Sequence, residues 1–191
     1  MKINIITCSP RLIKLNLNKN IIKKAIKNKI VEIYIHDIKK YSNYKNKKID
    51  CQNSENSNGM VLMTNPIINC INKIKKKKKN YNIYASPDGK KLTQKLVNKI
   101  SLNKNITIIS GKYKGIDERI RKKKIDKEIS IGNYVLSGGE LAIAILLDSI
   151  IRLLPDVLKN KISALTDSFQ NELKTSLDIY AKYHKLNKSK F

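Results

Sequence analysis

The rarer residue types of this chain gather in one third of its length. Six of the seven glycines lie between Gly89 and Gly139, and seven of the fifteen acidic residues lie between Asp117 and Asp156. Glycine lets backbone approach a ligand closely, and carboxylates are the natural acids and bases where histidine is scarce. The only histidines are His36 and one near the carboxyl terminus. Any proton transfer is therefore expected to fall to carboxylates.

The run Ser137-Gly138-Gly139-Glu140 is typical of a helix N-terminus. It predicts a capping box, in which the serine accepts from the amide three residues on and the glutamate reaches back. The two glycines would leave backbone donors open to a ligand. Residues 141–154 are apolar on nearly every side, which predicts burial in a core or a subunit interface. Neither GxGxxG nor GxxxxGKS/T occurs, which excludes a dinucleotide fingerprint and a P-loop.

Positive charge dominates the composition, with 40 Lys and Arg against 15 Asp and Glu and a net charge of +25. Such a surface is either solvated lysine or a contact for nucleic-acid phosphates, and composition alone leaves both open. The longest nearly uncharged apolar stretch, residues 141–147, is far below the ~20 residues of a membrane helix. Three scattered cysteines suit neither a disulfide framework nor a metal motif. We expect a cytosolic protein without a membrane span.

Strands and helices alternate along the chain. Short apolar runs predict strands at residues 2–7, 31–38, 82–86 and 105–110. Helical spacing follows Pro10, where Ile21, Ile22, Ala25 and Ile26 share one face, and recurs in two later segments. This order predicts an α/β domain with a largely parallel sheet. Ligands of such sheets bind beyond the carboxyl ends of the strands.

Three connections carry more specific predictions. Residues 41–59 are polar and without a period, which predicts a long loop. Asn65 is expected to cap a helix with Pro66 at its first position and apolar residues from Ile67 to Ile74 on one face. Residues 86–89 are expected to form a turn that feeds the next helix, whose apolar face begins at Leu92.

Five ordered blocks of sequence together resemble one known family. They read Ser-Pro-Asp-Gly-Lys-Lys-Leu at 86–92, Gly-Lys-Tyr-Lys-Gly-Ile-Asp-Glu-Arg at 111–119, Ser-Ile-Gly-Asn-Tyr-Val-Leu-Ser-Gly-Gly-Glu-Leu at 130–141, Asp-Ser-Ile-Ile-Arg-Leu-Leu-Pro-Asp-Val-Leu at 148–158, and Ser-Ala-Leu-Thr-Asp-Ser-Phe at 163–169. The family is that of the bacterial tRNA (guanine-37-N1)-methyltransferases, of the SPOUT class. Its members methylate guanine N1 just 3′ of the anticodon.

The resemblance implies an α/β domain over residues 1–158, with a parallel sheet, helices on both faces and a C-terminal trefoil knot, an exception to the usual unthreaded folds. Residues 159–191 would be a linker and a truncated remnant of a tRNA-binding domain. The implied partners are tRNA and a second copy of the chain, with active sites between the subunits. The implied cofactor is S-adenosylmethionine, held by three loops. Its binding residues here would be Tyr84, Ser86, Pro87, Gly89, Gly111, Tyr113, Gly115, Ser130, Ile131, Gly132, Tyr134, Leu136, Gly138 and Gly139.

Two residues match the family's catalytic positions. Asp167 would be the general base that removes the N1 proton, and Arg152 would stabilise negative charge on guanine O6. The competing interpretations are an N-cap for Asp167 and an ion pair with Asp148 for Arg152.

The chain also departs from the family. Lys112 replaces an arginine, and Lys114 replaces a glutamate implicated near a magnesium ion, so Mg²⁺ dependence stays open and no metal ligand is assigned. Asn133 replaces an aspartate. Two alternatives to guanine-N1 methylation therefore remain: methylation of another RNA target by the same knotted fold, and a basic RNA-binding relic without catalysis.

Overall fold

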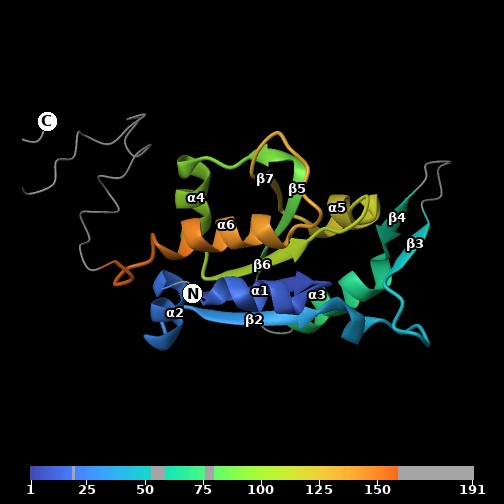
Figure 1. Ribbon diagram of the computed structural model, residues 1–191, viewed down its shortest axis with the longest axis horizontal. Coiled ribbons are helices and arrows are strands. Elements are labelled where there is room, and N and C mark those ends of the chain that lie inside the picture. The colour runs from blue at the N-terminus through green and yellow to red at the C-terminus, as the bar shows by residue number, and fades with distance from the viewer. Residues whose placement is uncertain (19, 53–58, 76–79, 159–191) are drawn as a thin grey trace, which may run out of the picture.

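A five-stranded sheet forms the centre of the computed structural model, which describes residues 1–18, 20–52, 59–75 and 80–158 (Figure 1). Its strand order is β2 (Glu32–Asp37), β1 (Lys2–Thr7), β6 (Asn105–Ser110), β5 (Tyr81–Lys91) and β7 (Lys127–Ser130). Every neighbouring pair in this sheet is parallel. The predicted α/β class with a parallel sheet is confirmed.

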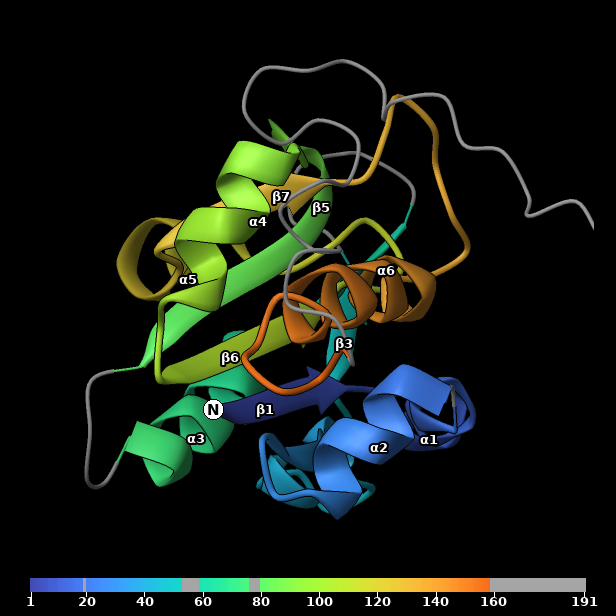
Figure 2. The same ribbon diagram turned by 90° about the vertical axis from the view of Figure 1, so that its left-hand side faces the viewer.

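Helices cover both faces of the sheet (Figures 1 and 2). Apolar residues of α1 (Pro10–Leu17), α2 (Asn20–Lys27), α4 (Gln94–Ser101) and α6 (Glu140–Ile151) join one buried cluster. Those of α3 (Thr64–Lys75), α5 (Glu118–Lys124) and the 3₁₀ helix η1 (Ile38–Tyr41) join a second cluster. Side chains of a strand alternate between faces, so Ile3 and Ile5 of β1 enter the first cluster and Ile6 enters the second.

Three local predictions were wrong in part. The helical pattern after Pro10 forms two helices, α1 and α2, and Ile26 is 37% exposed. The loop at 41–59 contains strand β3 (Asp50–Gln52), which pairs antiparallel with β4 (Met60–Leu62). Three residues are too few to show a period, so this pairing leaves no signal in the sequence. Helix α3 begins at Thr64, so Asn65 is not its cap and Pro66 lies within the first turn, where no N–H is required.

The predicted turn at 86–89 was also wrong, because this stretch is a bulge within a strand. β5 runs on to Lys91 and shifts register against β7 between Ala85 and Lys90. A Cβ at Gly89 would collide with the backbone of Ile129, so glycine permits the close approach of the two strands. The helix that follows starts only at Gln94, where the Thr93 hydroxyl accepts from the Leu96 amide at 3.3 Å.

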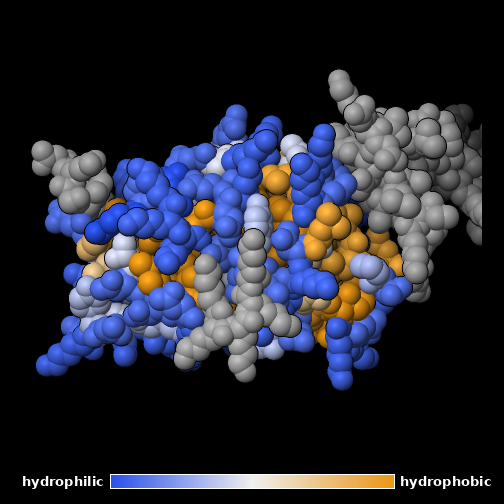
Figure 3. Space-filling view, turned by 180° about the vertical axis from the view of Figure 1, so that it is seen from behind, coloured by the Kyte–Doolittle hydropathy of each residue, from blue (hydrophilic) through white to orange (hydrophobic). Residues whose placement is uncertain are grey.

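Most of the back of the molecule is hydrophilic, with separate apolar areas (Figure 3). Within the described ranges, no helix is both long and apolar enough to cross a membrane.

Candidate functional site

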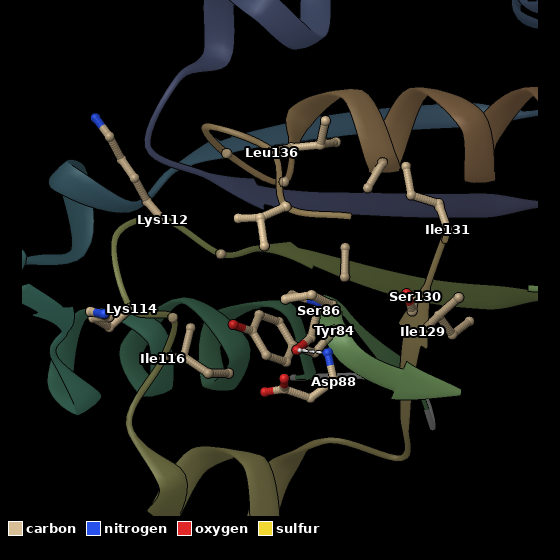
Figure 4. Close-up of a pocket in the computed structure, with 18 of the residues that line it drawn as sticks. Tyr84, Ser86, Asp88, Lys112, Lys114, Ile116, Ile129, Ser130, Ile131 and Leu136 are labelled. Atoms are coloured by element: carbon tan, nitrogen blue, oxygen red, sulfur yellow. Dashed lines mark hydrogen bonds between the residues drawn. The ribbon is translucent and has the colours of Figure 1, made fainter. Parts of the chain in front are cut away.

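A pocket lies where β5, β6 and β7 approach their carboxyl ends, beside the N-terminus of α6 (Figure 4). It holds about 770 Å³ of space between atoms, part of it open to solvent. Three segments line it: Tyr84 to Asp88 of β5, the Gly111–Ile116 loop after β6, and the stretch from Ile129 to Gly139 that leads from β7 into α6. This is the place that a parallel sheet predicts for a ligand.

Two glycines of the second segment lie close to the side chain of Tyr84. A Cβ at Gly111 or at Gly115 would lie 2.8 Å from the Tyr84 hydroxyl oxygen, and Gly115 has φ +109°, which side chains rarely adopt. Tyr84 is only 3% exposed. Burial raises the pKa of its hydroxyl, although the Ile116 backbone lowers that pKa in part. The glycines therefore let bare backbone line the pocket around a fixed, protonated tyrosine.

The third segment is tied to the second through backbone. The Gly139 amide donates to the Gly111 carbonyl at 3.0 Å, and a Cβ at Gly139 would lie 2.9 Å from Ser110 Oγ. The Ser130 hydroxyl donates to the Gly132 carbonyl at 2.9 Å. These contacts hold two loops, distant in sequence, as neighbouring walls of one cavity.

The predicted capping box does not form. Gly139 is the N-cap of α6, and no side chain caps it. Glu140 instead turns inward, is 6% exposed, and accepts a hydrogen bond from the Thr7 hydroxyl at 2.9 Å. A buried carboxylate is stabilised there by this donor and by the positive end of the helix dipole. The carboxyl end of β1 thus anchors the helix start beside the pocket.

An ion-pair network that the sequence analysis missed forms part of the wall. Arg121 of α5 donates to both carboxylate oxygens of Glu128, at 2.9 and 2.7 Å, and lies 3.3 Å from Glu118 and 3.5 Å from Asp88. The hydrogen-bonded Glu128 raises the pKa of Arg121 above its ordinary value. Arg121 and Asp88 both line the pocket. The chain has only four arginines, and this rarity was the signal that could have drawn attention to Arg121.

The two lysines that depart from the family pattern also line the pocket. Lys112 extends away from Tyr84 and Ser86 (Figure 4), with Nζ 5.1 Å from the Tyr113 ring centroid. Lys114 packs its stem at Gly59, where an added Cβ would lie 2.9 Å from Lys114 Cγ. Among the described residues, no group of three or more His, Cys, Asp or Glu is placed to hold a metal ion.

All of the predicted cofactor residues except Gly89 line this pocket. Gly89 serves the strand bulge instead. Arg152 is the C-cap of α6, at the opposite end of a 12-residue helix. With a rise of about 1.5 Å per residue, that end lies roughly 18 Å from the pocket. Asp167 and the predicted segment 159–191 lie outside the described residues.

Comparisons with known proteins agree on one family. The family model for tRNA (Guanine-1)-methyltransferase TrmD matches residues 1–191. A tRNA (guanine-N(1)-)-methyltransferase of Christiangramia forsetii is 49% identical over 174 residues, which cover 91% of this chain and 77% of that protein. The protein of the same name from Cytophaga hutchinsonii is 48% identical, with 91% and 74% covered.

A solved structure is similar as well. The crystal structure of the tRNA (m1G37) methyltransferase from Aquifex aeolicus superposes with a TM-score of 0.78 at 35% identity, covering 84% of this chain and 72% of that one. Sequence and fold therefore lead to the same conclusion: the chain belongs to the tRNA (guanine-1)-methyltransferase family.

Proposed function

We propose that this protein methylates N1 of guanine 37 in tRNA, with S-adenosylmethionine as the methyl donor. The observation that carries the proposal is the pocket itself, which three segments build, two of them glycine-containing, in a chain matched over its full length by the family model. A neutral adenine and ribose need close backbone contact rather than charge, and Gly111, Gly115 and Gly139 provide it.

The pocket residues named above would hold the cofactor, whose sulfonium supplies an electrophilic methyl group. Among the described residues that line the pocket, the acidic side chain is that of Asp88, whose carboxylate lies 3.5 Å from Arg121. Tyr113, held at φ +59°, and Tyr134 are half-exposed aromatic side chains that line the same pocket. Backbone strain of that kind is common where a ligand is clamped. Magnesium is not assigned a role, since Lys114 offers no oxygen ligand.

The chemical step needs a base at guanine N1. Asp167 would accept the N1 proton, so that the electron pair left on nitrogen could form the bond to the methyl carbon while the methyl–sulfur bond breaks and S-adenosylhomocysteine leaves. Arg152 would stabilise the negative charge that develops on O6. One chain cannot place Arg152 at its own pocket, given the length of α6 between them. A second copy that brings its Arg152 to this pocket resolves the separation.

The surface beside the pocket fits such a second copy. Leu141 and Ile145 of α6 are 56% and 44% exposed, and Leu12 and Leu15 of the adjoining α1 are 50% and 68% exposed. Exposed apolar groups gathered on neighbouring helices are typical of a protein interface. We therefore propose a homodimer, working in the cytosol on tRNA.

The test is incubation of the full chain with labelled S-adenosylmethionine and unmodified tRNA, followed by mapping of the methylated base. Label at N1 of guanine 37 supports the proposal. Label on another base would favour another RNA methyltransferase of the same fold. Failure to bind S-adenosylhomocysteine in calorimetry would indicate an RNA-binding relic. Sedimentation of the same sample tests the dimer separately.

A further inference from the structure

A second cavity lies on the face of the sheet that α3 covers, and it extends from Lys2 at the start of β1 to His36 near the end of β2. We call it the amino-end groove. It is lined by Lys2, Asn4, Tyr34, His36, Tyr41, Lys73, Ile74, Asn80 and Asn105, and holds about 930 Å³ of space between atoms, part of it open to solvent. The start of β1 and helix α3 lie side by side there (Figure 2). None of its lining residues is acidic.

Two lysines stand over aromatic rings in this groove. Lys2 Nζ is 4.5 Å from the Tyr34 ring centroid, and Lys73 Nζ is 5.6 Å from that of Tyr41. Neither lysine is ion-paired with a carboxylate in the part of the chain that the structure describes. The exposed Glu32 accepts from the Tyr34 hydroxyl at 2.8 Å instead. The ring faces hold both ammonium groups in the groove without a direct ion pair, and Glu32 lies opposite Lys2 in the register of β1 and β2.

His36 lines the groove together with the two lysines. His36 Nδ1 lies 2.9 Å from the Tyr41 hydroxyl, and Nε2 lies 3.0 Å from Asn4 Oδ1. Because Oδ1 can only accept, Nε2 carries the hydrogen, and Nδ1 accepts from the tyrosine. Burial lowers the pKa of His36, and the charges of Lys73 and Lys2 lower it further. The groove is thus a preorganised, positive site with a neutral floor.

We propose that the amino-end groove binds a backbone phosphate of the RNA substrate, remote from the methylation pocket. Ammonium groups suit the phosphate, and aromatic and amide side chains beside them suit the attached nucleoside, as in grooves that bind single strands. The five steps from Lys2 to Thr7 along β1, at about 3.3 Å each, put the Lys2 end of the groove roughly 17 Å from the carboxyl end of that strand. An RNA that fills both sites must extend well beyond the target guanine. The inference rests on the proposed function and adds a contact surface to it.

The test compares two variants with the same change in net charge. Lys2→Gln/Lys73→Gln empties the groove of cations, and Lys23→Gln/Lys27→Gln removes two exposed lysines of α2 as the matched control. Binding of full-length chains to labelled unmodified tRNA is measured by anisotropy across a salt series. The groove variant is expected to bind roughly tenfold more weakly than the control. Its slope of log affinity on log salt should be shallower by about 0.7 for each phosphate that the groove lysines no longer neutralise.

A second readout reports on the groove alone. In an NMR titration, tRNA should raise the pKa of His36 in the native protein, because a bound phosphate offsets the two ammonium charges. Equal weakening of both variants would overturn the proposal. So would a His36 shift with inorganic phosphate but none with tRNA, since the site would then serve free phosphate.

The two proposals fail differently. If the native protein binds no tRNA, the proposed function fails. If it binds tRNA, and the groove variant binds as well as the control, only the groove inference fails. Calorimetry with S-adenosylhomocysteine confirms that both variants keep an intact pocket.

Discussion

A methyl group added at Gly111 tests whether the pocket depends on the close approach of its second segment to Tyr84. The new Cβ of Gly111→Ala would lie 2.8 Å from the tyrosine oxygen and 3.2 and 3.3 Å from two ring carbons. Ordinary van der Waals contact begins near 3.4 Å. The oxygen would have to retreat by about 0.6 Å, the difference between 3.4 and 2.8 Å.

Tyr84 has little freedom to retreat. It is 3% exposed and belongs to β5, which is paired on both sides by β6 and β7. Overpacking of this kind typically costs about 1–3 kcal/mol. For a chain of this size each kcal/mol lowers Tm by roughly 2–4 °C, so we expect a drop of roughly 2–12 °C. Because the displaced ring lines the pocket, affinity for S-adenosylhomocysteine should fall about tenfold or more, which corresponds to about 1.4 kcal/mol.

The matched control removes the oxygen that the methyl group would meet. Calorimetry and thermal unfolding are measured for Gly111→Ala, Tyr84→Phe and the double variant. If the clash is with the hydroxyl, the double variant recovers stability and affinity, with a coupling energy of about 0.5–3 kcal/mol. Strict additivity of the two changes would refute the reasoning, as would a Gly111→Ala protein that binds and melts like the native one.

Further outcomes are expected at three other positions. Asp167→Asn should cut single-turnover methyl transfer by roughly 10²–10⁴ with unchanged cofactor affinity, and a reduction below tenfold would exclude it as the base. Lys114→Glu should make the transfer rate rise with added magnesium, because a carboxylate is an oxygen ligand; equal, flat responses of both proteins would contradict this. Thr7→Val leaves the buried Glu140 without its donor and should cost about 1–3 kcal/mol in urea unfolding, whereas Thr7→Ser should cost much less.

The fold was predictable where one segment carries its own signal. β1 and β6 were predicted with the bounds observed, because isoleucines placed among polar residues over six positions indicate a strand without reference to any other segment. β3 was not predicted, because its three residues form a strand only by pairing with β4. The bulge at 86–89 was read as a turn because Ser-Pro-Asp-Gly has turn composition, and only the β7 backbone beside Gly89 makes it part of a strand.

The candidate site divides in the same way. The three glycine-containing blocks were recognisable by resemblance, and the structure brings them to one pocket. The partner of Glu140 was not predictable, because a local capping pattern competes with a donor 133 residues away. Arg121 was also missed, since two of its three carboxylates, those of Asp88 and Glu128, come from other elements and only Glu118 lies on its own helix. Contacts between residues of different elements cannot be predicted from a local sequence pattern.

The order of strands in the sheet has a consequence for how the protein is made. β1 leaves the ribosome first, yet it pairs with β6 and reaches Glu140, 133 residues later. At synthesis rates of about 5–20 residues per second, that interval is roughly 7–27 s. Until α6 is synthesised, the isoleucines of β1 and β6 that share a buried cluster with it lack that contact. Parallel pairing between distant segments is slow and prone to aggregation. Nascent chains are therefore expected to need a chaperone, and the pocket to form only after the start of α6 has been synthesised.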